Sequence, residues 1–105
     1  MSKNNDFTDG LKEHGVTKEG YAMNTNAIYT SLFGMTAQEL KESRQVPQKD
    51  TARDDMSLLE LAAVNLAELS ALERIKRTGA NGNRPTSEQS RIASSRVKDA
   101  IADVM

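Results

Sequence analysis

Apolar residues recur at helical spacing in four stretches of the chain, and turn-forming residues separate them. In the first stretch, four apolar residues share one helical face: Ala27, Ile28, Leu32 and Phe33. Gly34 follows directly, in the position of a glycine that ends a helix. A second short helix is expected over residues 37–44, and Pro47 prevents its continuation. The first half of the pattern therefore predicts two short helices.

The second half of the pattern predicts one long helix and one C-terminal helix. The run from residue 58 to residue 77 is rich in Leu and Ala, which are strong helix formers, and Gly79 ends it. An amphipathic helix follows the loop at residues 80–85, with these apolar positions: Ile92, Ala93, Val97, Ala100, Ile101 and Val104. No segment alternates as a strand does. The predicted fold class is all-α, with two short helices, one long central helix and a C-terminal amphipathic helix.

Three capping boxes give the expected helix starts. In such a box a Ser or Thr side chain and a Glu or Gln side chain three residues later each accept from a free backbone N–H. The pairs are Thr36 with Glu39, Ser57 with Glu60, and Thr86 with Gln89.

The long helix carries more apolar residues than one buried stripe needs. The stripe at helical period consists of Leu58, Ala62, Leu66, Leu69, Leu72 and Ile75, and Leu59, Leu61, Ala63 and Val64 widen it. We therefore expect this helix to lie at the centre of the molecule, covered on several sides. Asn65 falls near the middle of the stripe, where it is either hydrogen-bonded in the core or sets the register of a helix–helix interface. A homodimer that buries the surplus leucines is a possible assembly.

Residues 1–24 are polar, and their glycines, Gly10, Gly15 and Gly20, are spaced five residues apart. Because glycine is costly inside a helix, this segment is expected to be a flexible N-terminal arm with at best one helical turn around Phe7 and Leu11. Residues 25–105 then form a single helical domain.

The composition argues against several classes of function. The chain has 14 basic and 15 acidic residues, without the basic excess of a general nucleic-acid binder. It has no cysteine and one histidine, His14, so we expect no enzyme activity, no catalytic or metal site and no cofactor. No apolar stretch is long enough for a membrane span, and the first residues do not resemble a signal peptide. We expect a soluble, cytoplasmic protein with no membrane association.

The segment RDDM, residues 53–56, admits a chemical and a structural interpretation. Asp54 and Asp55 could be a metal-binding or acid/base pair, but they stand just before Ser57, the first residue of a capping box. Acidic groups there are favoured by the positive end of the helix dipole. We therefore interpret the pair as a helix start.

Two blocks around this segment resemble a module of phage and prophage proteins. FGMTAQELK (33–41) and RDDMSLLELA (53–62) are similar to the C-terminal module of KilA-N and BRO-type phage proteins and of the DNA-damage-inducible protein D family, and IASSRVKDAI (92–101) resembles its closing helix. Asp55 stands where that module has His or Asn, and Ser94 where it has Gly. The resemblance covers residues 25–101 and implies an antirepressor-like or inhibitor-like module that binds a host or phage regulatory, repair or defence protein.

The sequence offers two sets of binding residues. A protein partner could be bound by the acidic segment and two arginines: Asp50, Arg53, Asp54, Asp55 and Arg96. The alternative is DNA binding, through a helix-turn-helix-like hairpin over residues 25–44 or through a basic patch. The patch consists of Arg74, Lys76, Arg77, Arg84 and Arg91, with Arg96, if these residues converge. On the hairpin, Gln38, Lys41, Ser43 and Arg44 would face DNA, whereas Glu39 and Glu42 would oppose it.

Overall fold

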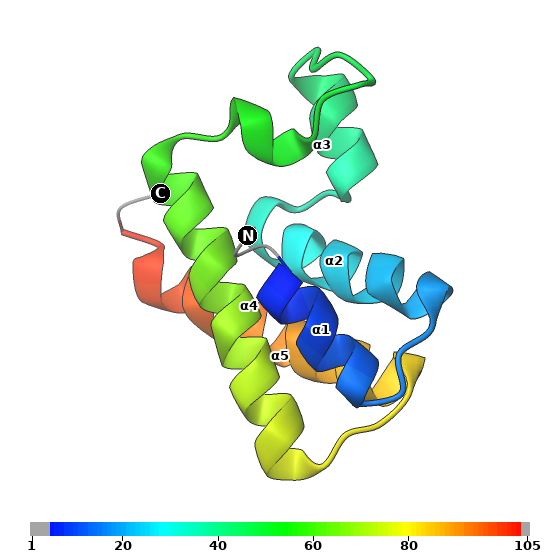
Figure 1. Cartoon of the computed structure of the whole chain (residues 1–105). Helices are drawn as coiled ribbons and strands as arrows, with labels where there is room; N and C mark the ends of the chain where they lie inside the picture. The colour runs from blue at the N-terminus through cyan, green and yellow to red at the C-terminus, as the bar shows by residue number, and fades with distance from the viewer. Residues whose placement is uncertain (1–4, 104–105) are drawn as a thin grey trace.

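The computed structural model describes residues 5–103, which form five α-helices and one 3₁₀ turn without a strand (Figure 1). The elements are α1 (Asn5–Glu13), α2 (Lys18–Phe33), α3 (Ala37–Ser43), η1 (Ala52–Asp55), α4 (Leu58–Thr78) and α5 (Asn83–Ile101). The all-α prediction with a long helix and a C-terminal helix is confirmed. None of the helices in the described part of the chain is long and apolar enough to cross a membrane.

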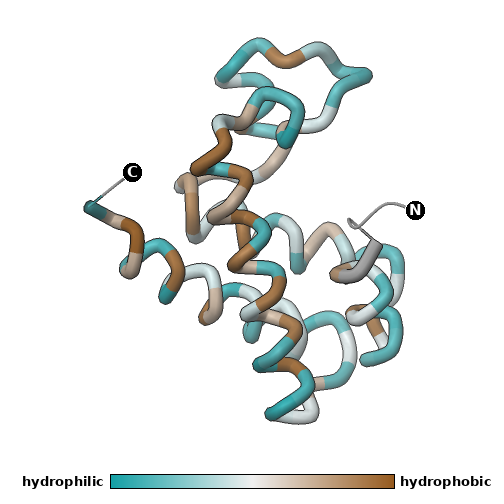
Figure 2. The backbone as a smooth tube through the Cα atoms, turned by 60° about the vertical axis from the view of Figure 1, so that its left-hand side comes forward, coloured by the Kyte–Doolittle hydropathy of each residue, from teal (hydrophilic) through white to brown (hydrophobic). Residues whose placement is uncertain are grey.

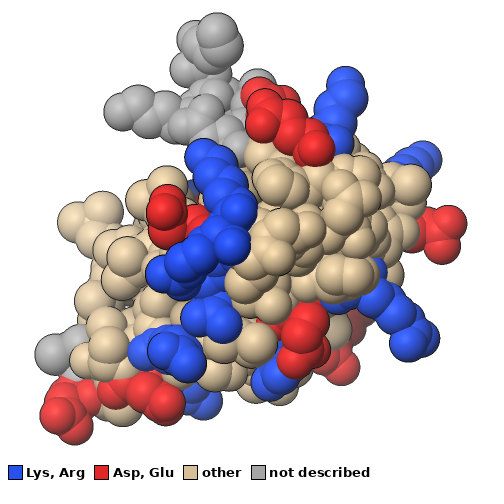
Figure 3. Space-filling view, turned by 90° about the horizontal axis from the view of Figure 1, so that it is seen from below, with Lys and Arg blue, Asp and Glu red and all other residues tan. Residues whose placement is uncertain are grey.

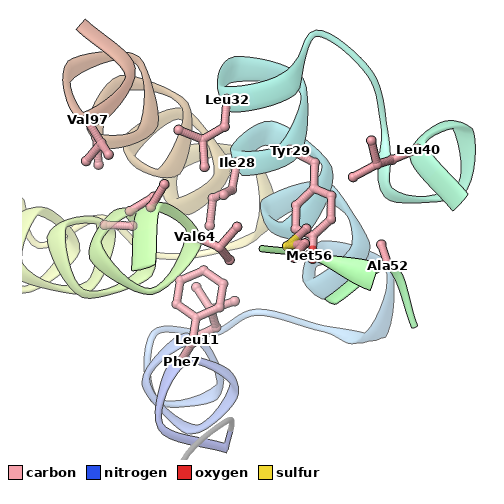
Figure 4. Packing of buried hydrophobic residues seen from close by; sticks show 14 of the residues in the cluster. Phe7, Leu11, Ile28, Tyr29, Leu32, Leu40, Ala52, Met56, Val64 and Val97 are labelled. Carbon is pink, nitrogen blue, oxygen red and sulfur yellow. The ribbon is translucent and has the colours of Figure 1, made fainter. Parts of the chain in front are cut away.

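The core lies where α2, α4 and α5 pack on one another. α5 contacts both α2 and α4, α1 covers α4, and α3 with η1 stands at the far end of the molecule (Figure 1). Phe7 and Leu11 of α1 point towards Val64 of α4, and Met56 and Ala52 lie beside Tyr29 of α2 (Figure 4). The core therefore gathers side chains from every helix.

The prediction of a flexible arm is wrong for residues 5–24, which form α1 and the first part of α2. Phe7 and Leu11 are buried. The glycines that suggested disorder are places of close approach. A Cβ on Gly10 would lie 2.4 Å from Leu72 Cδ2, and a Cβ on Gly20 would lie 2.0 Å from Asn83 Oδ1. The expectation for residues 1–4 lies outside the described residues.

The first part of α2 is fastened to the start of α5 by side-chain hydrogen bonds. The Thr17 N–H donates to Asn83 Oδ1 (2.9 Å), and Asn83 Nδ2 donates to Thr17 Oγ1 (2.8 Å). One turn further on, Asn24 Nδ2 donates to Thr86 Oγ1 (3.1 Å), and Ser90 Oγ donates to Asn24 Oδ1 (2.5 Å). Asn24, Thr86 and Ser90 are fully buried and satisfy one another, so the domain does not divide at residue 25.

Two of the three capping boxes are confirmed. Those of α3 and α4 form as expected, with Thr36 and Glu39 in one and Ser57 and Glu60 in the other. The third is wrong, because α5 begins at Asn83 and places Thr86 inside the helix. The buried hydroxyl of Thr86 donates to the carbonyl of Gly82 (2.7 Å). Val104, expected on the apolar face of the last helix, lies outside the described residues.

The predicted leucine stripe of α4 is mostly on the wrong side. The buried face of the helix is formed by Ala63, Val64, Ala67, Ala71 and Ile75. Leu58, Leu66 and Leu69 are instead 86%, 48% and 62% exposed. Small side chains on the buried face let α2 and α5 come close to the α4 backbone, which leaves the larger leucines outside. Of the expected stripe, Ile75 is buried and Leu72 is half-buried.

Candidate protein interface

The corner before α4 is held by a paired arginine and glutamate. Arg44, which ends α3, donates from Nη1 to Glu60 Oε1 (2.9 Å) and from Nη2 to Glu60 Oε2 (2.5 Å). The same carboxylate accepts from the Ser57 N–H in the capping box of α4 (3.0 Å). The hydrogen bonds from Arg44 hold the pKa of Glu60 down at about 2. Glu60 therefore starts α4 and ties it to α3.

Arg53 of η1 is engaged in a second cluster, on the flank of α4. Its guanidinium donates to Asn65 Oδ1 (2.7 Å) and to Glu68 Oε2 (3.4 Å). Burial raises the pKa of Glu68, and Arg53 partly offsets that effect. Burial also raises the pKa of the Tyr29 hydroxyl, although the positive charge of the neighbouring Arg53 acts to lower it. Asn65 is thus exposed and bonded to Arg53, and it is not the core residue that the stripe suggested.

The acidic candidates on the connector serve local structure. Asp54 Oδ2 accepts from the Thr51 N–H (2.9 Å) and so caps η1. Asp55 is exposed, with Oδ2 at 3.9 Å from Arg44 Nη1. Asp50 donates its backbone N–H to the carbonyl of Pro47 (3.0 Å). Within residues 7–103, no group of three or more His, Cys, Asp and Glu side chains could hold a metal ion.

Several polar side chains of the helix-turn-helix-like hairpin are bonded to other groups of the chain. Lys41 Nζ donates to the carbonyl of Gln48 (3.0 Å), and Gln38 Nε2 donates to Glu42 Oε2 (3.3 Å). Arg44 is bound to Glu60, as described above. Ser43 is exposed at the last position of α3. Two of the side chains assigned to DNA, Lys41 and Arg44, therefore have partners on the connector and α4.

The basic candidates divide into two sets. Arg74, Arg77 and Arg96 line one groove between α4 and α5. The other three are exposed elsewhere: Lys76, Arg84 and Arg91. Arg91 is paired with Glu88 and lines a separate hollow between α2 and α5, beside Asn26 and Thr30. Figure 3 shows Lys and Arg side chains gathered in a band at the end of the molecule where α4 finishes, with Asp and Glu scattered around it.

The α4–α5 groove is open and has an apolar floor with a basic rim. Its volume is about 330 Å³, and its lining comes from both helices: Leu66, Ser70, Glu73, Arg74 and Arg77 of α4, with Ala93, Arg96, Val97 and Ala100 of α5. Arg96, expected beside the acidic connector, is therefore grouped with Arg74 and Arg77. Arg74 Nε donates to Gln89 Oε1 (3.0 Å), which holds its guanidinium at the groove.

An apolar surface continues from this groove along α4. We call it the leucine face and define it by Leu58, Leu59, Leu66 and Leu69, each more than 40% exposed. Leu66 belongs to both the groove and the face. Apolar stretches recur along the whole of α4 in the view that brings this side of the molecule forward (Figure 2). The sequence indicated a surplus of leucines on this helix but placed Leu58, Leu66 and Leu69 in its buried stripe, so it did not show which leucines are exposed.

Comparison with models of protein families identifies the family of this chain. The family model of the DinD C-terminal domain matches residues 1–105, which is the whole chain. The chain belongs to the DinD C-terminal domain family. The match includes residues 1–24, so the resemblance expected over residues 25–101 extends to α1 and the start of α2. No curated protein and no solved structure matches the chain significantly.

The residues of the blocks that carried the resemblance build the fold. Gly34 ends α2 with a positive φ of 78°, and the Ala37 N–H donates to Asn26 Oδ1 (3.3 Å). Met56 is buried, while Arg53 and Glu60 each belong to an ion pair beside α4. The motif therefore marks the corner formed by α3, η1 and the start of α4.

Proposed function

We propose that this DinD C-terminal domain is an interaction module that binds and modulates a regulatory, repair or defence protein through the leucine face of α4. Its action is of the antirepressor or inhibitor type, on a host protein, and its origin is a phage or mobile element. The family connects the domain with proteins induced by DNA damage, which favours a partner that acts during that response.

The leucine face is the observation that carries the proposal. Soluble monomers rarely expose a large contiguous apolar patch, and such a patch usually marks a place of association. Leu58 and Leu69 are more than half exposed on a helix that buries alanines instead. Burying leucine side chains against a partner stabilises the complex by roughly 25 cal/mol per Å² of apolar surface removed from water.

DNA binding is the second candidate, and one observation favours it. Arg74, Arg77 and Arg96 gather at one groove, as a phosphate-binding patch would require. The floor of that groove is apolar, and the leucine face continues it. Phosphate contacts would leave these apolar side chains in water. The protein partner therefore remains the preferred function.

Site-specific photo-crosslinking in living cells tests the proposal. A photoreactive amino acid is placed at Leu69, or at Lys98 as the control, because Lys98 is exposed on α5 outside the groove. After treatment with a DNA-damaging agent, we expect one protein adduct from position 69 that is absent from position 98. Adducts to nucleic acid alone, or no adduct from position 69, would contradict the proposal.

A further inference from the structure

The α4–α5 groove combines an apolar surface with a positively charged one, and one partner could contact both. Leu66 and Val97 contribute apolar floor, and three guanidinium groups, those of Arg74, Arg77 and Arg96, stand around it. The lining contains one carboxylate, Glu73. The groove is therefore apolar within and positively charged at its rim.

The three rim arginines are available to a partner. None of them forms an ion pair within residues 7–103, whereas Arg44, Arg53 and Arg91 each hold a carboxylate of this chain. Arg74 is positioned through Nε by Gln89, so its two terminal nitrogens are not used in that hydrogen bond. Arg77 and Arg96 are exposed. A partner that brings carboxylates would neutralise charges that the domain leaves unpaired.

The leucine face extends the apolar floor, since Leu66 belongs to both surfaces. An amphipathic helix fits such a surface, because its apolar stripe can lie in a groove while its flanks meet the rim. We infer that the α4–α5 groove and the leucine face together bind one amphipathic helix of a partner protein, with acidic residues flanking its apolar stripe. This inference rests on the proposed function and names the chemistry of the partner.

Two other kinds of occupant, a second copy of this chain and DNA, fit the surface less well. A second copy of this chain, docked with the two-fold axis through the groove, would bring one set of rim arginines towards the other, and like charges would then oppose association. A DNA duplex would pair with the arginines, but it offers nothing apolar for Leu66 and Leu69. Single-stranded DNA normally stacks its bases on aromatic side chains, and the groove lining contains none.

Fluorescence anisotropy with three labelled peptides tests the inference on the full chain. Each peptide has about 18 residues and is stapled as a helix about 27 Å long, which covers most of the 21 residues of α4. The first has a leucine stripe flanked by glutamates, the second replaces the glutamates by lysines, and the third replaces the leucines by serines. We expect the first peptide to bind at least about tenfold more tightly than either of the others at about 0.15 M salt.

A charge-reversed variant makes the test specific for the groove. Arg77→Glu with Arg96→Glu should weaken the glutamate peptide at least about tenfold and strengthen the lysine peptide. The matched control is Lys18→Glu with Lys98→Glu, which changes the net charge equally at exposed positions on α2 and α5, outside both the groove and the leucine face. The control should bind the glutamate peptide within about threefold of the unaltered chain. Circular dichroism melting of both variants shows whether they are folded.

Four results would overturn the inference. Three of them are equal binding of the glutamate and lysine peptides, equal weakening by both charge-reversed variants, and a dimer of this chain that the glutamate peptide dissociates, seen in sedimentation. Displacement by duplex DNA at a lower concentration than unlabelled glutamate peptide would also overturn it. If any of these occurs while position 69 still crosslinks to a protein, the inference about the acidic helix fails and the proposed function stands. Loss of the crosslink removes the proposed function itself.

Discussion

The two sides of α4 are built in opposite ways. On the side of α3 and η1, Glu60 and Glu68 are each held by an arginine from the preceding segment. On the other side, Leu58 and Leu69 extend into solvent, and none of the elements within residues 5–103 buries them. The ion-paired side of α4 stabilises the fold, and the exposed leucines are available to a partner.

The RDDM segment, residues 53–56, lies on the side of α4 that faces α3 and η1. Its arginine, Arg53, is bound within the chain, and its aspartate, Asp54, caps η1. The leucine face is instead formed by residues whose spacing in the sequence is typical of the buried stripe of a helix. In this domain, the motif identifies the fold, and the exposed leucines identify the candidate interface.

The largest predicted effect comes from adding volume to the buried face of α4. Ala67 is fully buried, so Ala67→Leu forces α4 away from its neighbours and should lower the free energy of unfolding by about 3 kcal/mol. The same substitution at the exposed Ala62 adds a leucine beside the leucine face and should change stability by no more than about 0.5 kcal/mol. Urea denaturation of the two variants measures the contrast. Equal effects would mean that the two sides of α4 have been assigned wrongly.

A smaller loss is expected when the flank cluster is opened. Arg53→Met removes the cation beside a mostly buried carboxylate, that of Glu68, and should cost about 2 kcal/mol of unfolding free energy. Adding Glu68→Gln removes the unpaired charge and should recover part of that loss. Chemical denaturation of the single and double variants checks both statements. An Arg53→Met protein as stable as the unaltered chain would show that the ion pair does not hold η1 on α4.

The Arg44–Glu60 pair should make stability depend on pH. The pKa of Glu60 is held at about 2 in the folded protein, below the value of about 4.3 for a free glutamate. The ionised carboxylate therefore stabilises the fold fully above about pH 4.3, and this contribution disappears as the pH falls towards about 2. Glu60→Gln should be about 1 kcal/mol less stable than the unaltered chain at pH 6, and the difference should shrink at pH 3.

The control for this pH effect is Glu13→Gln, at an exposed glutamate that forms no ion pair within the described residues. Its stability should stay within about 0.5 kcal/mol of the unaltered chain at pH 6. A difference for Glu60→Gln that stays constant from pH 6 to pH 3 would refute the role given to the ionised carboxylate.

Local signals in the sequence predicted local structure well. Gly34 and Gly79 end helices with positive φ, and Thr36 and Ser57 start them, because these effects involve only neighbouring backbone groups. The same reasoning failed for Thr86, since Asn83 starts α5 earlier through its bonds to a residue 66 positions away, Thr17.

Packing between helices was harder to predict. Helical period alone cannot tell which of two apolar stripes is buried, and α4 carries one of leucines and one of small residues. The repeat of Ala63, Ala67 and Ala71 at four-residue spacing was the available signal for close packing. Gly10 and Gly20 were misread for the same reason, because a missing Cβ matters only when a distant neighbour, Leu72 or Asn83, occupies its place.

The candidate interface was predicted in part. Arg74, Arg77 and Arg96 were among the candidates and do meet at one groove, but Lys76, Arg84 and Arg91 do not line it. For Arg84 and Arg91 this depends on which side of α5 faces α4, which the contacts of α5 with α2 help to fix, whereas Lys76 lies on a part of α4 outside the groove lining. The sequence could therefore suggest basic residues without showing how they divide.

The exposed leucines give the most direct test of the account, because truncating them should change stability little. In the variant Leu58→Ser with Leu69→Ser, both side chains already lie mostly in solvent. Urea denaturation should give a free energy of unfolding within about 1 kcal/mol of the unaltered chain. A loss of about 4 kcal/mol or more, as expected when buried leucines are truncated, would show that these leucines belong to the core and would remove the proposed binding surface.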